Sequence, residues 1–197
     1  MTSPNPSAPT DPEAQQTDAE VAPEALMTLP GFSRDRRQWR LVEIRRQGRW
    51  QPAMLTVWRR PPGSPLWVVH VMWSSNPDDG WGWFVFSDAT IRPLPDPGEA
   101  APPGAPSFGQ WRDAVAVPRE LAPPPGADQS DQERWQLAWI RVAGAWRSGL
   151  VTAVRRPAPT MPWIAYCRWG EDKQVAWLVH DGQGVRPAVP TADTHEG

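Results

Sequence analysis

The chain carries one stretch twice: TVWRRPPGSPLW at residues 56–67 and TAVRRPAPTMPW at residues 152–163, 96 positions later. A gapless alignment of residues 39–73 with residues 135–169 extends the match to 12 of 35 positions. Four tryptophan pairs fall in register, namely Trp39/Trp135, Trp50/Trp146, Trp67/Trp163 and Trp73/Trp169, and a two-residue deletion then aligns residues 83–93 with 177–187. Two copies are too few for a solenoid, so each copy should form a small domain or the two should pair.

Each copy has the sequence signature of short antiparallel strands, because segments rich in Val, Ile, Trp and Thr alternate with clusters of Gly, Pro and Asp. Gly48 and Gly144 should supply a positive φ in tight turns, and the prolines after Arg60 and Arg156 should end the second strand, since Pro has no N–H. The predicted strands are 39–46, 50–60, 66–75, 82–87 and 90–93 in the first copy, and 135–142, 146–156, 162–169, 174–180 and 184–187 in the second.

The third strand indicates which face forms the core, because only one alternating set stays apolar in both copies. Val68, His70 and Met72, with their counterparts Ile164, Tyr166 and Arg168, form the other set, in which we expect Val68 and Ile164 to be half covered. The set that we expect to point inward is Trp67, Val69, Val71 and Trp73 in the first copy, and Trp163, Ala165, Cys167 and Trp169 in the second.

Closure of five short strands into a barrel would remove the exposed sheet edges. The pattern resembles the Tudor and Agenet group of SH3-like barrels in its GRW and GAW turns (48–50 and 144–146), in third strands that end at Trp73 and Trp169, and in the closing IRPL (91–94) and VRPA (185–188). The acidic-aromatic-glycine element common after the third strand of Tudor domains is replaced by SSNPDDGWG (74–82) and GEDKQ (170–174). The resemblance implies an all-β chain with two small five-stranded antiparallel barrels in tandem.

Composition separates these barrels from the remaining chain. Residues 34–94 carry ten Arg against five acids, and residues 132–187 carry eight basic residues against four acids, whereas the other segments are acidic and rich in the 26 prolines. We therefore expect a disordered acidic tail at 1–33, barrels at 34–94 and 132–188, and a disordered tail at 189–197. A Pro-rich linker at 95–131 should contain a short docking segment near 106–117, PSFGQWRDAVAV, which we expect to bind within the same chain or to another protein.

Several features bear on location. Cys167 is the single cysteine, which excludes a disulfide framework and favours a reducing compartment. The N-terminal residues lack the pattern of a signal peptide, and no apolar run approaches the roughly 18 residues of a membrane span. Basic residues are almost all Arg, with Lys173 as the sole lysine, which hints at a GC-rich coding genome. We expect a cytoplasmic bacterial protein without a membrane partner.

The resemblance also implies a ligand site at one end of each barrel, where aromatic side chains from the first hairpin, the third strand and the next loop converge. The matching residues are Trp50, Trp73 and Trp81 in the first copy and Trp146 and Trp169 in the second. Such rings attract cations by about 0.5 to 2 kcal/mol each. The alternative is that these tryptophans only fill cores that are too small to bury enough aliphatic side chains.

Nucleic-acid binding is the alternative function, because arginines beside exposed aromatic rings grip phosphates and stack on bases. The candidate residues are Arg45, Arg46, Arg59, Arg60, Arg155 and Arg156. The net charge of −2 argues against a dedicated nucleic-acid protein. Paired arginines at a strand end also occur as solvated gatekeepers of hydrophobic strands.

Catalysis has little support in the sequence. His70, His180 and His195 occupy non-equivalent positions, and the chain lacks a catalytic triad order, metal-ligand spacing and a phosphate-binding loop. We predict no catalytic residue, no metal and no cofactor. The expected function is that of a non-catalytic adaptor that recognises a protein or peptide segment; the sequence does not predict its oligomeric state.

Overall fold

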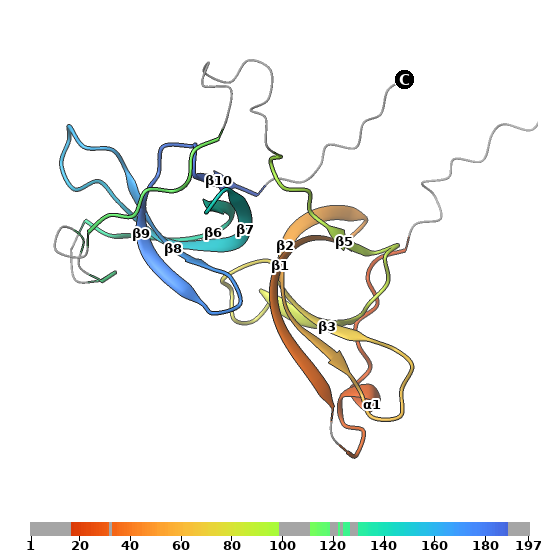
Figure 1. The fold of residues 1–197 in the computed structure, drawn as a ribbon. Helices are drawn as coiled ribbons and strands as arrows, with labels where there is room; N and C mark the ends of the chain where they lie inside the picture. The colour runs from red at the N-terminus through yellow and green to blue at the C-terminus, as the bar shows by residue number, and fades with distance from the viewer. Residues whose placement is uncertain are drawn as a thin grey trace, which may run out of the picture.

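The computed structural model describes residues 17–31, 33–98, 111–118, 122, 124–126 and 130–188. These residues form two five-stranded antiparallel sheets and one short helix, α1 (Glu24–Met27) (Figure 1). The prediction of an all-β chain with two such sheets is therefore confirmed. No helix in this described part of the chain is long and apolar enough to cross a membrane.

The two sheets have the same topology. The first has the order β4-β3-β2-β1-β5, and the second has the equivalent order β9-β8-β7-β6-β10. The strands are β1 (Arg34–Arg46), β2 (Arg49–Arg60), β3 (Val68–Met72), β4 (Trp81–Val85) and β5 (Ile91–Pro93), followed by β6 (Gln132–Val142), β7 (Ala145–Arg155), β8 (Ile164–Trp169), β9 (Gln174–Val179) and β10 (Val185–Pro187).

The first strand of each sheet begins earlier than predicted, at residue 34 instead of 39 and at residue 132 instead of 135. Pairing continues past a bulge, between Arg37 and Arg40 in β1 and at the equivalent place in β6, so that Arg34 still pairs with Arg60. A bulge interrupts the two-residue alternation and conceals the strand in the sequence pattern.

The predicted tight turns join β1 to β2 and β6 to β7. Gln47 and Gly48 have φ values of 51° and 72°, and Ala143 and Gly144 have values of 50° and 75°. Two consecutive positive φ angles are typical of a type I′ hairpin turn, in which glycine avoids the strain of a left-handed backbone.

An arm precedes each sheet and corrects the predicted chain organisation. The arms are DAEVAP (18–23), within the range predicted as a disordered tail, and DAVAVP (113–118), at the end of the predicted docking segment. In the first arm, the amide of Ala19 donates to the carbonyl of Arg45 in β1 and that of Ala22 to Trp83 in β4. The second arm makes the same pair of bonds, from Ala114 to Arg141 and from Val117 to Trp177.

Each arm thus bridges the two sides of its sheet and closes it into a barrel-like unit. Asp18 and Asp113 also accept hydrogen bonds from the turn amides of Gly48 and Gly144, at 2.9 and 3.0 Å. The two repeats therefore span residues 18–94 and 113–188, longer than the aligned copies. The docking segment binds within its own chain, although its residues 106–110 lie outside the described part.

The cores contain most of the side chains that the third strand was predicted to bury. Val69 and Val71 lie in the first core and Ala165, Cys167 and Trp169 in the second. Trp73 packs against the first core while remaining half-buried.

The prediction was wrong for Trp67 and Trp163, which are 38% and 39% exposed. Both precede their strands, at the rim of the sheet, where the ring of Trp67 lies 6.3 Å from that of Trp58 at the margin of the first core and stays partly exposed. Val68 and Ile164 were expected to be half covered and are instead buried. For Ile164 the reason is a cluster on the other face of the second sheet that includes Ala122 and Trp177.

The repeats pack against each other through equivalent surfaces. In Figure 1, β1 and β2 of the first repeat face β6 and β7 of the second. Contacts run from β1 to β7 and from β2 to β6, which is the reciprocal pattern of a pseudo-two-fold axis. The shared cluster contains the equivalent pairs Leu41/Leu137, Met54/Leu150, Trp39/Trp135 and Leu94/Ala188. The Leu41 amide also donates to Ser148 Oγ across the interface, at 2.8 Å.

Candidate binding cleft between the repeats

The structure does not assemble the predicted aromatic site at the end of the first barrel. Trp73 follows β3 on the core side and packs on Phe84. Trp81 lies on the opposite face, where its ring is 5.3 Å from that of His70, and is 51% exposed. Trp81 pairs with Met72 and shares its face, whereas Trp73, the next residue after Met72, points to the other face. The two tryptophans therefore cannot enclose one ligand.

The remaining candidate rings already have partners from their own chain. The Arg46 guanidinium lies 3.6 Å from the ring centre of Trp73, and that of Arg92 lies 4.1 Å from Trp50. Trp146 packs edge-on against Trp111, two residues before the second arm, and Trp169 is part of the second core. These rings therefore pack against side chains of their own chain, and two of them do so in cation–π pairs.

The arginines of the nucleic-acid hypothesis are mostly engaged in the same way. Arg59 donates two hydrogen bonds to Asp35, at 2.9 and 2.7 Å. Arg155 makes the equivalent bidentate pair with Asp131 and is only 2% exposed. These guanidinium groups also lie 4.6 Å from the rings of Trp83 and Trp177.

Four candidate arginines remain. Arg46 pairs with Asp79 at 3.4 Å, and Arg45 is half-buried. Only Arg60 and Arg156 are exposed, and each donates from Nε to a carbonyl of the loop that follows its strand. Five of the six arginines are thus held by hydrogen bonds or ion pairs within the chain, and Arg45 is half-buried.

The ion pair between Arg59 and Asp35 shifts the pKa values of both side chains. Hydrogen bonding to Arg59 holds the pKa of Asp35 below its usual value. The same bond raises the pKa of Arg59. The pair therefore stays charged throughout the physiological range.

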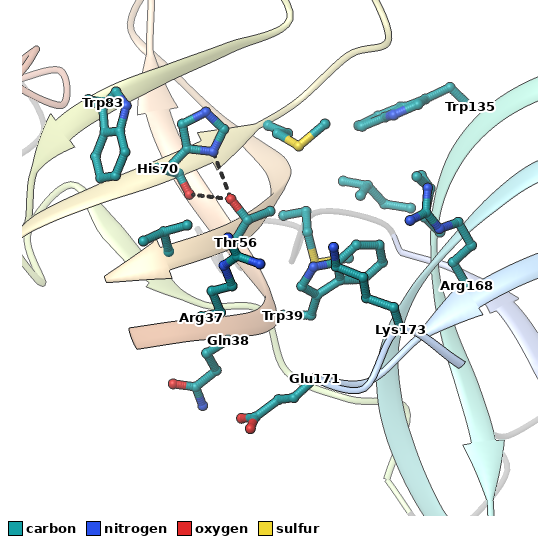
Figure 2. Close-up of a pocket in the computed structure, with 15 residues that line it drawn as sticks. Arg37, Gln38, Trp39, Thr56, His70, Trp83, Trp135, Arg168, Glu171 and Lys173 are labelled. Atoms are coloured by element: carbon teal, nitrogen blue, oxygen red, sulfur yellow. Dashed lines mark hydrogen bonds between the residues drawn. The ribbon is translucent and has the colours of Figure 1, made fainter. Parts of the chain in front are cut away.

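A cleft of about 520 Å³ lies between the repeats and contains none of the eleven predicted site residues. Figure 2 shows it with first-repeat side chains such as Arg37 and Trp39 facing Trp135, Arg168 and Lys173 of the second. We call this the inter-repeat cleft, and its lining consists of Arg37, Gln38, Trp39, Met54, Thr56, Val57, His70, Met72, Trp83, Trp135, Leu137, Leu150, Arg168, Glu171 and Lys173.

The cleft combines an apolar floor with a basic rim. Met54, Leu137 and Leu150 belong to the buried inter-repeat cluster, and Trp39 and Met72 pack against it. Arg37, Lys173 and Glu171 are exposed, and Arg168 is half-buried. The ionisable rim thus carries three positive groups against one negative group at neutral pH.

Sequence reasoning missed this site, although a signal for it exists. Both Leu41 and Val42 are apolar, as are Leu137 and Ala138, so that both faces of β1 and β6 carry apolar side chains. A small sheet with one solvated face should alternate instead. The second apolar face, with the matched pair Trp39 and Trp135, marks the contact between repeats.

His70 lies on the wall of the cleft in a well-defined environment. Its Nδ1 is 2.7 Å from Thr56 Oγ1 (Figure 2). Its ring packs against Trp81 and Trp83 at 5.3 and 5.2 Å. Burial, with a smaller contribution from the charge of Arg59, holds the pKa of His70 below its usual value. The imidazole is therefore neutral at pH 7.

This pKa shift predicts an effect of pH on stability. His70 in the unfolded chain takes up a proton near pH 6.5, whereas in the folded chain it does so only at lower pH, so acid favours unfolding. Lowering the pH from 7 to 5 should reduce the free energy of unfolding of the wild type more than that of His70→Gln. Urea titrations at several pH values would measure this, and parallel profiles would contradict it. His180, whose pKa is shifted in the same direction mainly by burial, remains in both proteins.

Cys167 has the properties of a core residue. Its thiol is buried, donates to the carbonyl of Ala165, and has its pKa raised to about 12 by burial.

Within the described residues, no group of three or more His, Cys, Asp or Glu side chains is placed to hold a metal ion. Comparison of the chain with models of protein families, with curated proteins and with solved structures finds no match.

Proposed function

We propose that the chain is a non-catalytic binding protein that takes a short protein segment into the inter-repeat cleft. On this proposal the repeats are SH3-like barrels that resemble Tudor domains. They act together as one adaptor in the cytoplasm. The observation that carries the proposal is the cleft itself, because its walls come from both repeats and its floor is apolar.

The dimensions and chemistry of the cleft support a peptide ligand. Its volume of about 520 Å³ lies within the range of about 300 to 1,000 Å³ typical of small-molecule pockets, which is enough room for a large side chain of a peptide. Trp39, Trp83 and Trp135 offer large rigid surfaces, and Met72 adapts to different side chains. A segment with one large apolar side chain would bury it on this floor.

Nucleic acid is the weaker candidate on the same observations. The arginine pairs that suggested it include Arg59 and Arg155, which are bound to Asp35 and Asp131. The chain also has a net charge of −2, whereas polyanion binding depends on accumulated positive charge. Protein segments are therefore the better match.

A selection from a random peptide library displayed on phage, with the full chain as bait, tests the proposal. Binders should lose at least about tenfold in affinity for Trp39→Ala, because central aromatic anchors dominate peptide interfaces. Trp67→Ala is the matched control, since Trp67 is also partly exposed but lies outside the cleft. Circular dichroism establishes that both variants are folded. Equal loss in both variants, or no binder that depends on Trp39, would reject the proposal.

A further inference from the structure

We infer that the segment bound in the inter-repeat cleft is acidic, and that the guanidinium of Arg168 binds one of its carboxylates. This inference rests on the proposed function and specifies the chemistry of the partner. It follows from three properties of Arg168, namely its free hydrogen-bonding capacity, its divergence from the other repeat, and its position between two clefts.

The charged side chains on the cleft rim are not held in ion pairs. Within the described residues, Arg37, Arg168 and Lys173 make no ion pair, and neither does Glu171, the single acid of the lining. By contrast, Arg59 and Arg155 each form an ion pair with a carboxylate of their own repeat. The excess positive charge of the rim is thus complementary to an acidic ligand.

Arg168 has an unmet hydrogen-bonding requirement. Its Nε is buried and has no hydrogen-bond partner among the described residues. Its guanidinium lies 5.7 Å from the ring centre of Trp39, so it reaches across the interface towards the first repeat (Figure 2). The terminal nitrogens make no hydrogen bond among the described residues and are not buried as Nε is, and a carboxylate can accept from both of them at once.

The duplication shows that the fold does not require an arginine at this position. Met72 is the equivalent residue of the first repeat, and both residues lie in the third strand of their sheets on the outer face. Met72 contributes to the apolar floor, whereas Arg168 brings a charge to the same cleft. The difference gives the cleft one apolar side and one cationic side.

Arg168 also lies where two clefts meet. A second cleft, on the outer face of the second repeat, is lined by Thr152 and Tyr166, the equivalents of Thr56 and His70, and it shares Trp135 and Arg168 with the inter-repeat cleft. A segment bound in the inter-repeat cleft would place its carboxylate at Arg168 and its apolar side chain on Trp39 and Met72.

The peptides selected with the full chain test the inference. Asp or Glu should be enriched at one position beside a large apolar residue. Affinity for a synthetic selected peptide should fall at least about tenfold in Arg168→Met, because hydrogen bonds to charged groups are strong. Arg168→Met introduces the residue of the other repeat at its equivalent position. Arg156→Met, which removes an exposed arginine outside the cleft, should leave affinity unchanged.

A change in the peptide gives the reciprocal test. Replacing its Glu with Gln, or its Asp with Asn, should weaken binding to the wild type about as much as Arg168→Met does, and should have little further effect on that variant. Peptides that depend on Trp39 but show no acidic enrichment and bind Arg168→Met normally would overturn the inference while leaving the proposed function intact. Binding of a fluorescent single-stranded oligonucleotide that depends on Arg168, without any cleft-dependent peptide, would overturn both.

Discussion

Replacing Asp131 with alanine should lower the free energy of unfolding by about 3 to 5 kcal/mol. The pair formed by Asp131 and Arg155 is buried, with side-chain exposures of 7% and 2%. Removal of the carboxylate leaves the Arg155 guanidinium under the ring of Trp177 without its bidentate partner. The cost arises because the buried guanidinium loses its bidentate carboxylate and not because the intact pair is strongly stabilising.

The first repeat provides the matched control for this experiment. Asp35 and Arg59 make the same bidentate pair, but their side chains are 36% and 26% exposed. Asp35→Ala should therefore cost no more than about 1 kcal/mol, since exposed pairs are screened by water. Denaturant unfolding followed by tryptophan fluorescence would measure both variants. Equal losses of unfolding free energy in Asp131→Ala and Asp35→Ala would show that burial does not distinguish the two ion pairs.

Leu41→Ala should lower the free energy of unfolding by about 2 to 5 kcal/mol, because it leaves a cavity in the contact between the repeats. Leu41 is completely buried in the inter-repeat cluster with Leu137 and Leu150. The substitution keeps the backbone amide that donates to Ser148, so it tests the packing of the side chain alone.

Leu66→Ala is the control for this second substitution, because Leu66 is 45% exposed in the loop between β2 and β3. It should change stability by less than about 0.5 kcal/mol. Thermal and urea unfolding of both variants would decide the matter. A Leu41→Ala protein as stable as the wild type would mean that the repeats do not depend on each other.

The sequence predicted those parts of the fold that depend on local interactions. Gly48 and Gly144 mark the hairpin turns because a positive φ selects for glycine. The alternating third strand identified Val71 and Cys167 as core residues because the side-chain direction in a strand follows from position alone.

The arms escaped prediction because their hydrogen bonds are made with distant residues. DAEVAP and DAVAVP are short and lie in proline-rich acidic surroundings, which are typical of disordered chain. Their order comes from the edges of β4 and β9 and from the turn amides of Gly48 and Gly144. These partners are about 30 or more positions away along the chain.

The candidate site was missed for a related reason. The inter-repeat cleft exists only where two sheets meet, and the apolar outer faces of β1 and β6 indicate the contact without fixing how the sheets are oriented. Resemblance instead drew attention to Trp50 and Trp73, whose rings are covered by Arg92 and Arg46. An exposed cation–π site and an internal one have the same residue types, so the sequence does not distinguish them.

The central claim is that a protein segment binds between the two repeats. The most direct test follows the indole Nε1–H signals of the 14 tryptophans by nuclear magnetic resonance, while a peptide selected against the full chain is added. Single Trp→Phe variants would assign the signals.

Binding in the inter-repeat cleft should shift the signals of Trp39, Trp83 and Trp135, which line it. The signals of Trp146 and Trp169, in the body of the second repeat, should stay in place. Shifts confined to Trp50 and Trp73, with Trp39 and Trp135 unchanged, would place the ligand at the end of a barrel and contradict the account.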